Sequence, residues 1–123
     1  MLKEPRQPLI GIVGVCASGK TTLIAELKQL GYNCRHIAQE HSYVKDMWKR
    51  MTNPDLLIYL EASYPATIER RKLNWSESEY SEQLRRLEHA RVNADIVINT
   101  NSLTSAEVLE AALAQIAAHM GQP

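Results

Sequence analysis

A glycine-rich stretch near the start of the chain carries residue types that bind phosphate groups. Residues 14–21 read Gly-Val-Cys-Ala-Ser-Gly-Lys-Thr and match the pattern G-x-x-x-x-G-K-[ST]. A polyphosphate needs several backbone N–H donors that converge on it, and glycine permits the close backbone approach that this requires. In this pattern the lysine (Lys20) brings positive charge to the terminal phosphates, and the hydroxyl of Thr21 is a ligand for Mg²⁺. The residues expected to contact the phosphates or the metal ion are Gly14, Cys16, Ala17, Ser18, Gly19, Lys20, Thr21 and Thr22.

The residues on either side of this stretch provide the context that the pattern requires. Residues 9–15 are short, apolar and β-branched, which predicts a buried strand. Leu23, Leu27 and Leu30 recur at helical spacing, and Gly31 stands where a glycine commonly follows a helix. Such a helix would point its N-terminal N–H groups and its positive dipole at the phosphates. The alternative, a glycine-rich turn with an incidental lysine, is disfavoured by this strand–loop–helix order.

An acidic residue follows the second predicted strand, which spans residues 32–38. Glu40 should project at the carboxyl edge of the sheet beside the glycine-rich stretch. There it could hold the water shell of Mg²⁺ or accept a proton from an acceptor hydroxyl, and the alternative is a solvated acid in a turn. Gln39 and His41 flank it, and either could orient a water molecule or an acceptor. For His41, a surface or helix-capping position is the alternative.

Arginines gather in the second half of the chain. One group ends a predicted helix that Ser63-Tyr64-Pro65 opens, and the other lies on a helix that Ser76 and Glu79 should begin as a capping box. Guanidinium groups bind phosphate oxygens bidentately and stack on bases. A solvated, charged helix face is the alternative, because several of these arginines have glutamates at i±3 or i+4. The arginines are Arg70, Arg71, Arg85, Arg86 and Arg91.

The remaining elements complete an alternating order of strands and helices. Residues 41–51 predict a helix with Val44, Met47, Trp48 and Met51 on one face, and residues 56–60 and 96–98 predict strands. A C-terminal helix should begin at a second capping-box pattern, Thr104 and Glu107. This order predicts an α/β fold with a parallel sheet of about four strands, helices on both faces and right-handed crossovers.

Composition narrows the possible classes of protein. The 123 residues fit a single domain, residues 1–123, with no room for a separate substrate domain. The charges of fourteen basic and fourteen acidic residues cancel, so nucleic acid is an unfavoured partner. No apolar run approaches the roughly 20 residues that span a bilayer. Two cysteines cannot form a disulfide scaffold, and the first residues lack an apolar signal segment, so we expect a cytoplasmic protein. The histidines and cysteines lack metal-ligand spacing, and a homodimer is compatible with so small a core.

On these residues the chain resembles the kinase branch of the P-loop NTPases, which includes thymidylate, deoxynucleoside, nucleoside-monophosphate and shikimate kinases. Beyond the glycine-rich stretch, residues 55–63 followed by Ile68-Glu69-Arg70-Arg71 resemble the family's strand, arginine-ending helix and lid. Residues 93–100 resemble its closing strand, so the resemblance covers about residues 9–118. It implies a three-layer P-loop NTPase fold with a lid-like segment at about residues 70–91.

The same resemblance implies roles for individual residues. Arg70 or Arg71 would lie against the base, Arg85 or Arg86 would close on the phosphates, and Asn101 would lie in the turn that wraps the adenine. Two departures stand out. Only about twenty residues separate Lys20 from Gln39, where the family inserts an acceptor-binding segment and another strand. The family also commonly has an aspartate where this chain has Asn99.

The expected function is transfer of the γ-phosphoryl group of Mg-ATP to a small acceptor, which would be a nucleoside, a nucleotide or another metabolite. Lys20, Glu40, Arg85 and Arg86 are the expected catalytic residues, and Thr21 and Glu40 are the expected Mg²⁺ ligands. The alternative is a nucleotide-binding switch or slow ATPase that acts through a protein partner. The missing acceptor segment favours this alternative, and the retained lid-like arginines argue against it.

Overall fold

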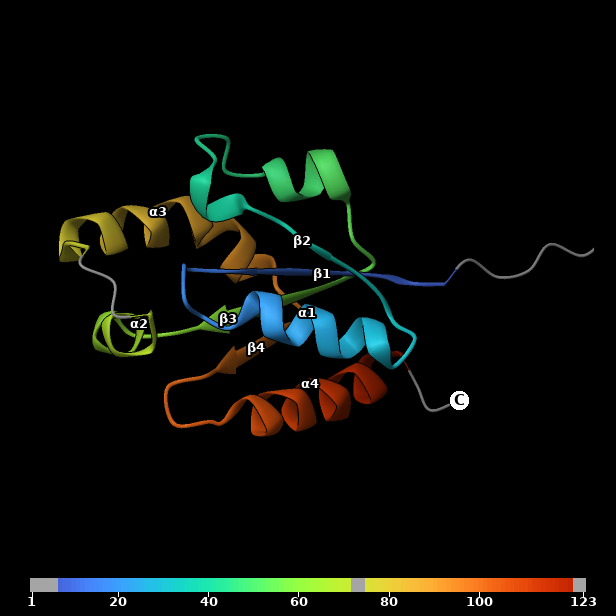
Figure 1. Cartoon of the computed structure of the whole chain (residues 1–123). Coiled ribbons are helices and arrows are strands. Elements are labelled where there is room, and N and C mark those ends of the chain that lie inside the picture. The colour runs from blue at the N-terminus through green and yellow to red at the C-terminus, as the bar shows by residue number, and fades with distance from the viewer. Residues whose placement is uncertain (1–6, 72–74, 121–123) are drawn as a thin grey trace, which may run out of the picture.

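Four parallel strands form one sheet in the order β2-β1-β3-β4 in the computed structural model (Figure 1). The structure describes residues 7–71 and 75–120, and it describes Arg71 by its backbone alone. The inner strands β1 and β3 are buried on both faces, which explains their continuous apolar sequences. In the edge strand β4 the side chains alternate between buried and exposed. The strands are β1 (Leu9–Gly14), β2 (Asn33–His36), β3 (Leu56–Glu61) and β4 (Ile96–Asn99). The predicted α/β class and four-stranded parallel sheet are confirmed.

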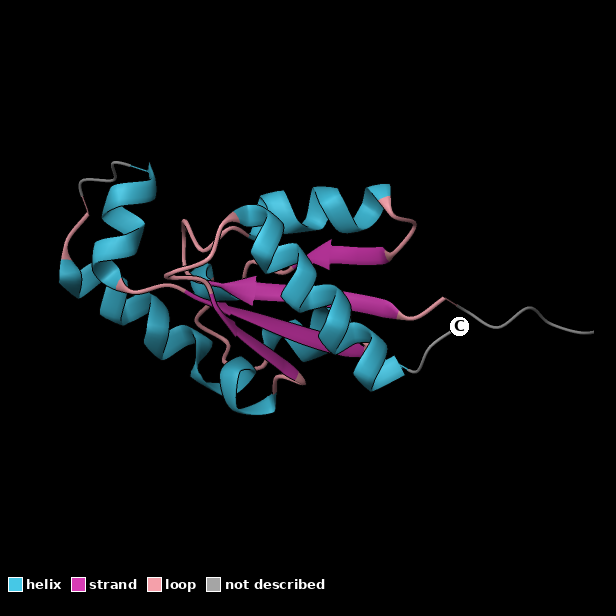
Figure 2. Cartoon of the chain, turned by 90° about the horizontal axis from the view of Figure 1, so that it is seen from below, coloured by secondary structure: helices cyan, strands magenta, loops and turns pink. Residues whose placement is uncertain are grey.

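Helices cover both faces of this sheet (Figure 2), an arrangement compatible with a three-layer α/β fold. α1 (Lys20–Gln29) and α4 (Ser105–Met120) pack together on one face. α3 (Glu77–Asn93) packs on the other face, and α2 (Tyr64–Arg71) follows β3. None of the described helices is long and apolar enough to cross a membrane.

Each face of the sheet has its own apolar core. Alternate side chains of β1, such as Ile10 and Ile12, join the core beneath α1 and α4, while Val13 joins the core beneath α3. The second core also holds Trp48 and Leu87, both of which are buried. Burying these apolar side chains is the main term that stabilises the domain, at about 25 cal/mol per Å² of apolar surface.

The predicted helix ends agree with the structure. The side chain of Ser76 accepts from the backbone N–H of Glu79, and the Glu79 carboxylate accepts from the backbone N–H of Ser76. Thr104 and Glu107 make the same pair of reciprocal bonds at the start of α4. Gly31 follows α1 with φ 94°, a left-handed conformation that glycine adopts at little cost.

The helix predicted over residues 41–51 is wrong. The chain forms a 3₁₀ turn, Gln39–His41, and a separate π-helical turn, Trp48–Thr52, with irregular backbone between them. The buried side chain of Gln39 accounts for the difference, since its amide bonds to backbone groups of Val44 and Trp48 that a continuous helix would pair internally. Val44 and Met51, predicted to face a core, are 50% and 75% exposed.

Candidate functional site

The glycine-rich loop, residues 14–21, connects β1 to α1 at the carboxyl edge of the sheet. A Cβ atom on Gly14 would lie 2.6 Å from the carbonyl oxygen of Leu60 and 2.7 Å from Ser18 Oγ, so only glycine fits between β3 and the loop. Gly19 has φ 99°, and Ala17 also adopts a left-handed conformation, with φ 66°. Gly14 therefore meets a steric requirement of this turn, and Gly19 meets a conformational one.

The loop ends at a helix N-terminus that no side chain caps. Gly19 occupies the N-cap position of α1 and makes no side-chain cap bond, and the first turn contains no acidic residue. The N–H groups of this turn and the positive end of the helix dipole thus remain available for an anion. Thr21 and Thr22, in the same turn, are exposed. This combination is suited to binding phosphate.

Lys20 is buried within the glycine-rich loop, with 6% of its surface exposed. Its Nζ donates to the carbonyl oxygens of Gly14, at 2.5 Å, and Val15, at 3.0 Å. It also forms an ion pair with Glu40 Oε2 at 3.0 Å. A buried ammonium group requires such partners, and the arrangement fixes the charge at the mouth of the loop.

Glu40 lies beside the loop, at the place predicted for it. The residue is 3% exposed and belongs to the 3₁₀ turn that follows β2. Its Oε2 faces Lys20 and also lies 3.8 Å from His41 Nε2 and 4.0 Å from His36 Nε2. Burial, with the nearby charge of Lys20 as a second cause, holds the pKa of His36 below its usual value. Two sequence segments twenty residues apart thus supply opposite charges to one site.

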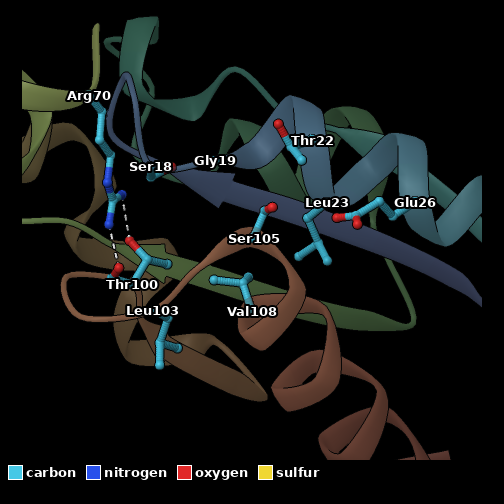
Figure 3. A pocket seen from close by; sticks show the side chains of 10 residues that line it. All are labelled: Ser18, Gly19, Thr22, Leu23, Glu26, Arg70, Thr100, Leu103, Ser105 and Val108. Atoms are coloured by element: carbon cyan, nitrogen blue, oxygen red, sulfur yellow. Dashed lines mark hydrogen bonds between the residues drawn. The ribbon is translucent and has the colours of Figure 1, made fainter.

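Arg70 reaches the site from α2, as Figure 3 shows. Its guanidinium group donates to Thr100 Oγ1 at 2.8 Å and to the carbonyl oxygen of Thr100, and it contacts the carbonyl oxygen of Ala17 at 3.3 Å. These bonds join α2, the glycine-rich loop and the residue that follows β4 through one side chain. The predicted role of the Arg71 side chain lies outside the described residues, as do residues 72–74 of the lid-like segment.

Two adjoining cavities surround the loop. The larger, of about 500 Å³, is called the loop cleft here and is lined by Lys20, Thr21, Glu40 and neighbouring residues of the loop. The smaller, of about 200 Å³, is called the side pocket and lies between α1, the start of α4 and the turn after β4 (Figure 3). Gly19, Thr22 and Arg70 line both cavities. The two spaces therefore meet at the first turn of α1.

Within the described part of the chain, three buried side-chain oxygens have no hydrogen-bond partner, and all three belong to residues that line these cavities. They are Ser18 Oγ, Glu26 Oε1 and Glu40 Oε1. Buried polar atoms in proteins are almost always paired, so an unpaired one calls for a specific explanation such as a ligand, an ion or water. A polar ligand, an ion or a water molecule in these two cavities can complete each of these atoms.

Three other residues that were predicted for the site line neither cavity: Arg85, Arg86 and Asn101. Arg85 is paired with Glu82, its side chain is 78% exposed, and it lines neither cavity. Arg86 also pairs with Glu82, stacks on the Tyr43 ring at 4.4 Å and reaches the carbonyl oxygen of Glu40 at 3.4 Å. The side chain of Asn101 accepts from the backbone N–H of Ser63 and lines neither cavity.

Residues that the sequence analysis did not assign to the site also shape it. The side chain of Gln83, buried in α3, accepts from the backbone N–H of Cys16 at 3.0 Å and donates to its sulfur at 3.2 Å. Thr100 anchors Arg70, and Glu26 extends into the wall of the side pocket. Gln83 and Thr100 act across long sequence separations, and no local pattern distinguishes any of these three residues.

The fold also brings together three groups that could hold a metal ion, although their spacing in the sequence suggested none. The ligand atoms of Cys16, Glu40 and His41 all lie within 4.8 Å of one another. Thiolate, carboxylate and imidazole are the ligands that zinc prefers. The predicted Mg²⁺ ligand Thr21 lies in the same loop cleft as Glu40.

A scan against models of known protein families found no match to the chain, and a search of curated proteins found none either.

Proposed function

We propose that the chain binds Mg-ATP through the glycine-rich loop and transfers the γ-phosphoryl group to a small acceptor, as a compact member of the kinase branch of the P-loop NTPases. The observation that carries this proposal is the buried ion pair between Lys20 and Glu40, whose Nζ and Oε2 atoms lie 3.0 Å apart. Both residues line the loop cleft, next to the uncapped N-terminus of α1. A cation, an acid and a set of free N–H donors are the groups that phosphoryl transfer requires.

In this proposal the phosphates enter the loop cleft and meet the first-turn N–H groups of α1. Lys20 exchanges its bonds to the loop carbonyls for bonds to the β- and γ-phosphate oxygens. Arg70, which already contacts Ala17 of the loop, adds positive charge at the other side. Both side chains would stabilise the negative charge of the transferring group.

The Thr21 hydroxyl and the Glu40 carboxylate fit a hard cation, which takes oxygen ligands. The unpaired Glu40 Oε1 is free to take a cation's water shell or the proton of an acceptor hydroxyl. Bound Mg²⁺ would neutralise charge on the phosphates. Arg86 contacts the backbone of Glu40, so in this proposal it holds the acid in place, while Arg85 stays on the surface.

A second function, a nucleotide-dependent switch or slow ATPase, is favoured by one observation. The segment that carries Glu40 also exposes apolar side chains, with Tyr43 87% exposed and Met51 75% exposed. Exposed apolar groups on one segment are suited to a protein partner. Through this segment, occupancy of the loop cleft could alter the surface that a partner contacts.

One experiment separates these functions. The protein is incubated with Mg-ATP and pooled nucleosides, nucleotides and metabolites, and phosphorus NMR follows the products. A new phosphoester supports the kinase, whereas ADP with inorganic phosphate alone supports the slow ATPase. We expect Lys20→Ala to lower either turnover by at least about 100-fold, because it removes the loop's cation. Lys28→Ala, an exposed lysine at the far end of α1, is the matched control and should keep full turnover.

Unchanged turnover in Lys20→Ala would show that the loop is not the phosphate site. An intact thermal unfolding transition in that variant is needed to separate lost chemistry from lost folding.

A further inference from the structure

The side pocket has the size and walls of a site for one planar ring. Its volume of about 200 Å³ is below the 300–1,000 Å³ typical of sites for drug-sized ligands. Leu23, Leu103 and Val108 provide apolar surface, and Arg70 forms the end next to the loop cleft (Figure 3). A guanidinium group fixed by Thr100 presents a flat face on which a ring can stack.

Glu26 lies in the wall of this pocket, on the same face of α1 as Thr22 and Leu23. It follows Lys20 by six residues, a separation of about 9 Å along the helix axis. It is therefore well separated from the phosphate end of the site, so its negative charge does not lie against the phosphates. A molecule bound by its phosphates at Lys20 would place its other end near Glu26.

One of the two carboxylate oxygens of Glu26 is unpaired. Its Oε1 is buried and accepts no hydrogen bond from the described residues. A carboxylate is only an acceptor, so the group that completes it must be an N–H or O–H donor. Leaving such an atom buried and unpaired costs stability, and a ligand that pairs it gains the corresponding affinity.

We propose that Glu26 selects the base of the bound nucleotide by accepting a hydrogen bond from an exocyclic amino group. This proposal rests on the proposed function, since it requires a nucleotide whose phosphates occupy the loop cleft. Adenine carries such an amino group at its 6-position and guanine at its 2-position. In both cases the donor lies on the ring edge, within the plane of a base stacked against Arg70.

Two pairs of nucleotides test this, because the members of each pair differ by one amino group. ATP is compared with purine riboside triphosphate, and GTP with inosine triphosphate, by titration calorimetry with Mg²⁺. We expect removal of the amino group to weaken binding by at least about tenfold in one pair, which identifies the preferred base. Glu26→Ala should abolish that difference. Glu110→Ala, which removes an exposed carboxylate from α4, should preserve it.

Inorganic tripolyphosphate separates this proposal from the proposed function, because it has no base. If tripolyphosphate binds but neither pair differs, or if Glu26→Ala leaves the difference unchanged, Glu26 does not read the base. If neither tripolyphosphate nor any nucleotide binds, the phosphate site itself is wrong and both proposals fail.

Discussion

The glycine-rich loop and the segment of residues 39–52 reach the same site by different physical means. Each follows a strand at the carboxyl edge of the sheet, and together they contribute the Lys20–Glu40 ion pair. The loop depends on residue types at their own positions, such as the glycine that avoids contact with Leu60. Segment 39–52 depends on Gln39, whose side chain replaces the backbone bonds of a helix. The loop is recognisable because it needs fixed residue types at fixed positions, whereas the side-chain bonds of Gln39 to the backbone of Val44 and Trp48 leave no such pattern.

Both regions are fastened to α3 by a buried glutamine. Gln83 of α3 holds the backbone of Cys16 in the loop, and Gln39 donates to the carbonyl oxygen of Arg86 in α3. Gln39 makes three bonds to backbone groups, whereas Gln83 makes one such bond and a weaker one to sulfur. The loop therefore relies on its glutamine less than segment 39–52 does.

The largest expected effect is a loss of turnover without a comparable loss of ATP affinity. It tests whether the loop binds the nucleotide while segment 39–52 supplies the catalytic acid. We expect Glu40→Gln to lower turnover by roughly 10² to 10⁴, the range for loss of a general acid or base, because an amide can neither take a proton nor carry the negative charge that a cation requires. Affinity for ATP should change only a few-fold, since Lys20 and the α1 N-terminus remain. Turnover by quenched-flow assay and affinity by calorimetry are the measurements.

Equal turnover in Glu40→Gln would remove Glu40 from the chemistry and direct the search to Glu61. Glu110→Gln is the control, because that exposed glutamate lies on α4 and lines neither cavity.

The next effect compares the two glutamines. Gln39→Ala removes three hydrogen bonds to backbone groups in a fully buried place, so it should lower the free energy of unfolding by about 3 kcal/mol, at roughly 1 kcal/mol for each bond. Gln83→Ala should cost about 1 kcal/mol. Urea denaturation followed by circular dichroism measures both. Equal losses would contradict the view that segment 39–52 depends more on its glutamine than the loop does.

The smallest effect concerns pH and His36, which lies between the two regions. Burial and the charge of Lys20 lower the pKa of this histidine in the folded protein, so the unfolded chain takes up a proton first as the pH falls below about 6.5. Stability should therefore decline on acidification through this range and recover as the pH rises. His36→Gln should make the decline shallower in unfolding curves recorded between pH 5 and 7.

His119, which lies in the last turn of α4, provides the control for this measurement. If His119→Gln flattens the pH dependence as much as His36→Gln does, the contribution does not come from the site.

Much of the scaffold was predictable, because its signals are local. The apolar run of β3, the leucine spacing of α1 and the capping box at Ser76 each express their structure within a few residues. The helix expected over residues 41–51 is wrong because its prediction used local signals alone. Its apolar spacing fits a helix, but the side chain of Gln39, which lies outside that range, takes its backbone bonds. Periodicity predicts burial only where the backbone keeps its internal bonding.

By itself, the sequence determined the order of the strands and of the helices outside residues 41–51, the parallel sheet, and the turn in which the glycines and Lys20 lie together. Only the tertiary structure decided which of the expected side chains join that turn, namely that Glu40 and Arg70 reach it, that Gln83 joins them, and that Arg85 stays paired at the surface. The physical reason is that backbone conformation follows from steric limits at each residue. The partner of a buried charge or amide is instead set by the packing of elements that are far apart in the chain.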